Sequence, residues 1–189
     1  MKLYPLFYSA IAVIVLTSCT SPEMPPQPQA DTNQVSQSQK VVVDKNFKAV
    51  MGQTIYVPVY SHIYYEDKKR IFNLAVTLSI RNTDLTNAVI VTSVRYHDST
   101  GKIIRQYLEK PIQLAALAST DFFVARTDTS GGLGANFIVE WVAQTEVSEP
   151  VIEAVMIGAD FQQGISFISP GKTIKTHNNS KRSSSVKDS

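Results

Sequence analysis

Alternating apolar and polar positions run through the middle of the chain, from about residue 46 to residue 174. The segment 53–65, QTIYVPVYSHIYY, places four apolar residues on one face, namely Ile55, Val57, Val59 and Ile63. The segment 72–80, FNLAVTLSI, repeats this pattern with its apolar residues at even positions. A period of two residues is typical of β-strands with one buried face, and no stretch has the 3.6-residue period of an amphipathic helix. The pattern therefore predicts an all-β domain.

Six further segments have strand character, and clusters of Gly, Asn, Asp and Pro separate them. The sequence HDSTG, between the first two, predicts a hairpin turn. Seven or eight short strands in about 130 residues favour one antiparallel β-sandwich, immunoglobulin-like or jelly-roll-like, with the topology left open. The six segments are AVIVTSVRY, KIIRQYL, TDFFVAR, NFIVEWVA, VIEAVMIGA and GISFI.

The two ends of the chain have a different composition from the middle. Residues 20–45 contain four prolines and almost no apolar side chains before Val41, and the last 14 residues, THNNSKRSSSVKDS, are polar. Such segments cannot bury a core, so we expect a disordered tether and a disordered tail. The predicted organisation is a signal peptide at 1–18, a tether at 19–45, the β-sandwich at 46–174 and the tail at 175–189.

The only cysteine of the chain, Cys19, follows a 14-residue apolar run that begins after Lys2. This run is too short for a transmembrane helix, which needs about 20 apolar residues, but it suits an export signal. Leu16-Thr17-Ser18-Cys19 resembles the bacterial lipobox, and the resemblance implies a diacylglyceryl thioether on Cys19, acylation such as palmitate, and cleavage before it. The predicted location is a membrane surface facing the periplasm or the cell exterior. The alternative is an ordinary signal peptide that happens to contain a cysteine.

Charge and motif spacing exclude several classes of function. The middle segment carries 11 Lys and Arg against 12 Asp and Glu, which gives no electrostatic basis for binding nucleic acid. The three histidines lack metal-ligand spacing, and no nucleophile motif is present, so we expect no metal, no cofactor and no enzymatic activity. The glycine cluster 131–134 precedes a strand and lacks a following lysine, so it predicts a turn rather than a phosphate site.

Tyrosines and a histidine occupy the polar face of segment 53–65, and Pro58 lies among them. Because proline has no backbone donor, this segment is predicted to be an edge strand or to contain a bulge. Its polar face is either a contact surface for sugar, peptide or protein, or a second buried layer whose hydroxyls reach water. The candidate binding residues are Tyr56, Tyr60, His62 and Tyr64.

Several segments together resemble one bacterial family. YVPVYSHIYY, LAVTLSIRNTD, VTSVRYHDSTGKIIRQYL, GGLGANFIVEWVA and PVIEAVMIG are similar to the family called domain of unknown function 3124, which occurs in small exported proteins. The resemblance covers about residues 52–172 and implies an exported lipoprotein, but it assigns no activity to any residue.

The functional expectation is a lipid-anchored envelope lipoprotein that binds a protein or an envelope component without catalysis. The alternative is a sensor domain for a small ligand, such as a carbohydrate. A ligand sensor needs a concave pocket with convergent polar groups, whereas a partner surface can be flat.

Overall fold

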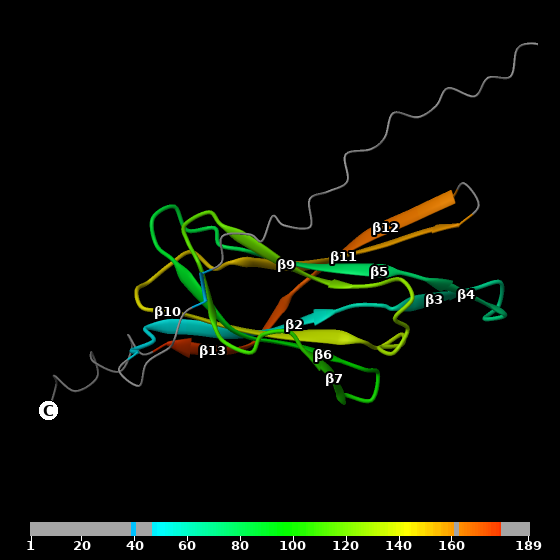
Figure 1. Cartoon of the computed structure of the whole chain (residues 1–189), viewed down its shortest axis with the longest axis horizontal. Coiled ribbons are helices and arrows are strands. Elements are labelled where there is room, and N and C mark those ends of the chain that lie inside the picture. The colour runs from blue at the N-terminus through cyan, green and yellow to red at the C-terminus, as the bar shows by residue number, and fades with distance from the viewer. Residues whose placement is uncertain (1–38, 41–46, 161–162, 179–189) are drawn as a thin grey trace, which may run out of the picture. The chain divides into compact units, whose positions relative to one another are not determined.

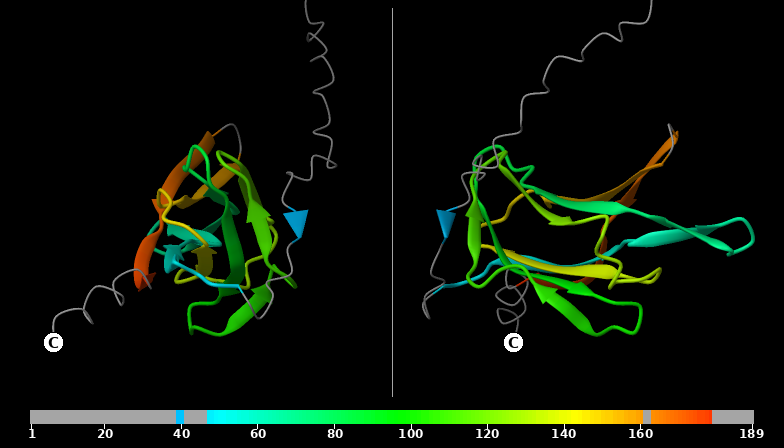
Figure 2. Two further views of the ribbon diagram at one scale, coloured as in Figure 1. Left: turned by 90° about the vertical axis from the view of Figure 1, so that its left-hand side faces the viewer. Right: turned by 45° about the vertical axis from the view of Figure 1, so that its right-hand side comes forward.

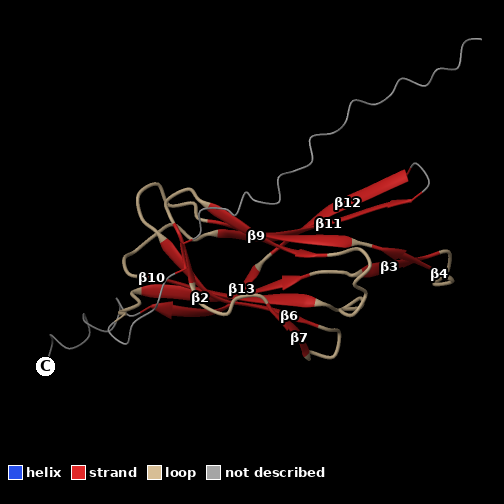
Figure 3. Cartoon of the chain, in the orientation of Figure 1, coloured by secondary structure: helices blue, strands red, loops and turns tan. Residues whose placement is uncertain are grey.

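The structure, a computed structural model, describes residues 39–40, 47–160 and 163–178. The chain divides by its contacts into residues 1–34 and 35–189, and every described residue belongs to the second unit. These residues form strands and loops only (Figure 3). None of them forms a helix that could cross a membrane. The expected signal peptide, Cys19, most of the tether and the tail after residue 178 lie outside the described residues.

Two antiparallel sheets pack face to face, which confirms the predicted β-sandwich (Figures 1 and 2). The larger sheet has the order β1-β8-β6-β10-β2-β13, with β7 paired to β6, and the smaller has the order β12-β11-β5-β9. A separate two-stranded ribbon joins β3 and β4. The strands of the larger sheet are β1 (Gln39–Lys40), β2 (Met51–Pro58), β6 (Val89–His97), β7 (Ile103–Gln106), β8 (Ile112–Leu114), β10 (Asn136–Ala143) and β13 (Lys172–Asn178). Those of the smaller sheet are β5 (Ala75–Arg81), β9 (Ser119–Val124), β11 (Val151–Asp160) and β12 (Gln163–Pro170), and the ribbon consists of β3 (His62–Tyr65) and β4 (Arg70–Asn73).

The core lies between the sheets and contains the apolar positions that the alternation predicts. Val57 of β2 and Leu78 of β5 are completely buried, as is Trp141 of β10. Apart from Gly52, the outward positions of the same strands are exposed or half-buried. Period-two patterning therefore determined which face of each strand is buried.

Two expectations about strand position are wrong. Strand β2 is not an edge strand, because it lies between β10 and β13, and it contains no bulge of its own: the register shift in its pairing with β13 lies on β13, between Thr173 and Lys175. Its pairing with β13 extends only as far as Tyr56, opposite Lys172, so the missing donor of Pro58 leaves no gap in the sheet on that side. The expected tail also begins too early: β13 continues through residues 175–178 and pairs with the start of β2.

The loop after β5 is held by two buried polar side chains, Asn82 and Asp84. The Asn82 amide donates to the carbonyl oxygens of Asn87 and Ala115, at 2.8 and 2.9 Å. The Asp84 carboxylate accepts hydrogen bonds from the backbone of Thr86 and Asn87, and from that of Ser148 at 3.0 Å. These hydrogen bonds hold the turn together, and the bond from Ser148 links it to the loop after β10.

Asp84→Asn should destabilise the protein at pH 7 more than at pH 3. The backbone hydrogen bonds from Thr86, Asn87 and Ser148 lower the pKa of Asp84 below its ordinary value of 3.8. A lowered pKa contributes stability above pH 3.8 that is lost as the pH falls below it. In the variant, an amide nitrogen replaces one of the two carboxylate oxygens, and it cannot accept the hydrogen bond that the Ser148 backbone donates. The difference in urea midpoint between wild type and variant should therefore shrink on acidification, whereas the exposed-site control Asp67→Asn should show little difference at either pH. An equal difference at pH 7 and pH 3 would contradict this role.

Candidate functional site

The four candidate binding residues do not share one face, because the segment that contains them is broken after Pro58. Tyr56 lies on β2 within the larger sheet, half-buried beside Ile138 and Lys172. Tyr60 lies in the connection that leaves the sheet, and its ring is 6.0 Å from that of Phe167 in β12. Neither side chain therefore lies on the face of β3 that carries His62.

His62 and Tyr64 lie on one face of the ribbon, together with Ile71 and Asn73 of β4. Tyr64 is directly opposite Ile71, and His62 is opposite Asn73. The rings of His62 and Tyr64 are 5.5 Å apart in an edge-to-face arrangement. Tyr64 is 43% exposed and Ile71 is 56% exposed, so this face carries contiguous apolar area in contact with water. We call these four residues the ribbon face.

The opposite face of the ribbon packs against the smaller sheet. Phe72 lies so close to Gly158 of β11 that a Cβ at that glycine would be 2.1 Å from the Phe72 ring. The ring of Tyr65 is 6.3 Å from that of Phe72. Only glycine allows this approach, and it fixes which face of the ribbon points outward.

The base of the ribbon is fastened by Ser61, which is completely buried. Its backbone amide donates a hydrogen bond to the carbonyl oxygen of Gly132. Its hydroxyl lies 3.3 Å from the carbonyl oxygen of Thr129 and 3.2 Å from that of Gly132. The Leu74 amide donates in turn to the carbonyl oxygen of Ser61, at 2.9 Å. These bonds connect the ribbon to the glycine-rich loop, which serves here as an inter-strand connection.

The ribbon lies at the end of the sandwich that is farthest from the start of β2 (Figure 1). Met51, where β2 begins, pairs with both Ala143 and Asn178, so the described segments before and after the domain meet at one end. Pro58 pairs with Asn136 at the other end, just before the ribbon. The ribbon face is thus separated from Met51 and Asn178 by the length of β2.

Ile71 and Asn73 are members of the ribbon face that sequence reasoning missed. The charged residues 66–69 form an exposed turn, and β4, which follows it, was not predicted as a separate strand. A signal was present: apolar pairs flank the polar run, Tyr64-Tyr65 before it and Ile71-Phe72 after it. Two such pairs around a short polar run are typical of a β-hairpin.

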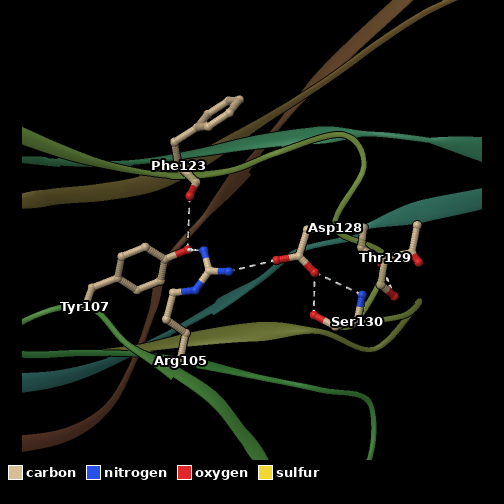
Figure 4. A network of polar contacts seen from close by, with 7 residues as sticks. Arg105, Tyr107, Phe123, Asp128, Thr129 and Ser130 are labelled. Carbon is tan, nitrogen blue, oxygen red and sulfur yellow. Dashed lines mark hydrogen bonds and ion pairs between the residues drawn. The ribbon is translucent and has the colours of Figure 1, made fainter. Parts of the chain in front are cut away.

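A second polar cluster joins the two sheets beside the end of β7 (Figure 4). Arg105 donates to the Asp128 carboxylate at 3.1 Å and to the Tyr107 hydroxyl at 3.3 Å. The Tyr107 hydroxyl donates to the backbone carbonyl of Phe123 in β9, at 3.1 Å. Asp128 also accepts from the amide and hydroxyl of Ser130.

The charge states of this cluster fit a structural role. Hydrogen bonds from Ser130, together with the charge of Arg105, lower the pKa of Asp128. Burial raises the pKa of Tyr107. Neither group therefore changes its protonation near neutral pH, as a general acid or base would need to do. The arrangement is a brace between β7 and β9.

A cavity of about 360 Å³ lies beside the brace. Its described lining runs along the connection from β7 to β8 and comprises Tyr107, Leu108, Glu109, Lys110 and Ile112. This volume is at the lower end of the range for small-molecule sites. In the part of the chain that the structure describes, no three His, Cys, Asp or Glu side chains come together as a metal site would require.

Comparison with known proteins places most of the folded domain in one family. Neither the curated proteins nor the solved structures contain a match to this chain. The family model described as "Protein of unknown function (DUF3124)" matches residues 52–174, which is well over half of the 189 residues. This span begins near the start of β2 and ends within β13. The chain therefore belongs to the DUF3124 family.

Proposed function

We propose that this chain is a lipid-anchored envelope protein whose ribbon face binds a protein partner without catalysis. The observation that carries the proposal is the exposed pair Tyr64 and Ile71, which lie directly opposite each other on the ribbon. Tyrosine is enriched at protein interfaces, and an apolar centre surrounded by charged residues is the usual composition of such a surface. The charged turn 66–70 supplies that rim.

The position of the ribbon also supports the proposal. Cys19, the proposed lipid site, precedes the domain, and the chain reaches β2 at the end that Met51 and Asn178 share. The ribbon face lies at the other end of the sandwich from Met51 and Asn178, so a partner bound there would not cover these two residues. With a lipid on Cys19, the proposed localisation is a membrane surface facing the periplasm or the cell exterior.

The double variant Tyr64→Ser, Ile71→Ser should lose most of the partner that wild type captures by crosslinking in intact cells. Both side chains are exposed, so the fold should remain stable while the apolar centre of the surface is removed. We expect the captured amount to fall about tenfold, as measured by quantitative mass spectrometry after pull-down, which corresponds to about 1.4 kcal/mol of binding.

The matched control is Leu85→Ser, which removes a side chain that is 77% exposed in the loop between β5 and β6. It should leave capture unchanged. Equal capture by wild type and the ribbon variant would refute the ribbon face as the binding surface.

The second candidate function, a sensor for a small ligand, is favoured by the cavity beside Tyr107. Its lining combines an aromatic ring with Glu109 and Lys110, which could orient a polar ligand such as a sugar. A ligand bound there would raise the unfolding temperature of the purified protein, and this rise would not depend on Tyr64 or Ile71.

A further inference from the structure

Exposed edges of β-sheets usually carry charges or are covered, because their free backbone groups can pair with other strands. Two described edges of this sandwich follow that rule. The edge strand β13 carries Lys172 and Lys175. The edge strand β9 carries Asp121, and the carbonyl oxygen of Phe123 is occupied by the Tyr107 hydroxyl.

Strand β12 is an edge strand without such protection. It forms the outer edge of the smaller sheet and pairs only with β11 among the described strands (Figure 1). Its sequence, QGISFISP, contains no charged residue, and its only proline is the last residue. Ile165 is 39% exposed and Ile168 is 61% exposed. An uncharged apolar edge of this length is typical of a strand that is paired in the functional state.

The register with β11 shows which backbone groups of β12 point outward. Gly171 donates to the carbonyl oxygen of Ile152 at 2.8 Å, and these residues continue the register in which Pro170 is opposite Glu153. Hydrogen-bonded and non-hydrogen-bonded pairs alternate along an antiparallel ladder. The N–H and C=O groups that point away from β11 are therefore those of Gly164, Ser166 and Ile168. Their side chains all lie on the outer face of the sheet.

We propose that β12 pairs with β12 of a second copy of this chain. Two copies of one edge related by a two-fold axis run antiparallel, and the axis then passes through a residue that is opposite itself. With the axis at Ser166, Gly164 lies opposite Ile168 of the second copy. All the outward groups of these three residues are then paired, in about six backbone hydrogen bonds. Pro170, which has no donor, lies beyond this paired region.

The side chains favour a second copy over an unrelated strand. No charged residue of β12 meets its own copy across the axis, and Ile168 is placed against glycine, where there is room for it. Closed two-fold dimers are also the commonest oligomers of soluble domains. Copies held on one membrane have a raised effective concentration, which favours pairing further. The proposal goes beyond the ribbon face and does not depend on it.

Charge reversal at the axis tests the proposal. Two differently tagged full-length copies, coexpressed in a bacterial host, should co-purify as wild type. If both copies carry Ser166→Lys, or both carry Ser166→Glu, like charges face each other and co-purification should fall about tenfold. One copy with Ser166→Lys and one with Ser166→Glu should restore it, since the two charges then attract. Restoration by mixing cannot result from misfolding of either variant.

The control Asp121→Lys introduces the same charge at the opposite edge of the sheet and should leave co-purification unchanged. The ribbon variant Tyr64→Ser, Ile71→Ser should also self-associate normally, so failure of the ribbon proposal is distinguishable from failure of this one. Absence of co-purification in wild type would overturn self-pairing. So would undiminished co-purification when both copies carry Ser166→Lys, or a different protein captured at wild-type level whose binding both Ser166 variants abolish.

Discussion

Cys19→Ser is expected to release the protein from membranes completely and to abolish its labelling by a radioactive or alkyne-bearing fatty acid. Serine cannot form the thioether through which diacylglycerol would attach. Each buried methylene contributes about 0.8 kcal/mol, so two or three acyl chains hold a protein stably, whereas an unlipidated chain has no comparable attachment. The measurement is the fraction of protein in the membrane pellet after ultracentrifugation, alongside acyl labelling.

A matched control moves the thiol rather than removing it. The double variant Cys19→Ser, Ser21→Cys keeps one cysteine but places it two residues past the lipobox, and it should also be released and unlabelled. Acyl labelling that persists in Cys19→Ser would refute the anchor. Retention without labelling would show that the membrane is contacted by another part of the protein.

Trp141→Ala is expected to cause the largest loss of stability among single substitutions in the core. Trp141 is fully buried between the sheets, on the central strand β10. Truncation of a buried tryptophan to alanine costs about 3–5 kcal/mol, a large part of the about 5–15 kcal/mol that stabilises a typical domain. Urea unfolding should be followed by circular dichroism, because Trp141 is the only tryptophan of the chain.

Trp141→Phe should cost much less than Trp141→Ala. The indole Nε1 of Trp141 is buried and has no hydrogen-bond partner among the described residues. A buried unpaired donor costs about 1–3 kcal/mol, and phenylalanine removes this donor while filling most of the volume. Equal losses for the two variants would contradict this account of Nε1 and of the volume that phenylalanine fills. A loss below about 1 kcal/mol for Trp141→Ala would contradict its place in the core.

Gly131, in the glycine loop, lies against the buried side chain of Tyr96. A Cβ at Gly131 would lie 1.9 Å from the Tyr96 hydroxyl, so this position accepts only glycine without rearrangement. Burial raises the pKa of Tyr96 to about 12, so the hydroxyl remains neutral. The glycine cluster therefore has a packing role, consistent with the interpretation as a turn rather than a phosphate site.

Period-two patterning, readable in the sequence alone, determined the fold class and the core. Val57, Leu78 and Trp141 are buried because residues two apart on a strand point to the same side, whatever the strand pairs with. The HDSTG hairpin turn and the turn hydrogen bonds near Asp84 are also determined by short stretches of sequence, because a few neighbouring residues satisfy each other's hydrogen bonds. The family was also evident from short segments.

Only the tertiary structure decided which strands are neighbours, and with that the candidate surfaces. Pro58 favoured an edge strand, yet β2 is internal because pairing with β13 stops at Tyr56, before the proline. Tyr60 and Tyr64 follow one alternation but lie apart, because the chain leaves the sheet after Pro58, and Ser61, between the two tyrosines, is buried against the glycine loop. The unprotected edge of β12 likewise depends on which strand lies beside β11. Strand order results from contacts between residues far apart in the chain, and alternation along one strand carries no information about its partner.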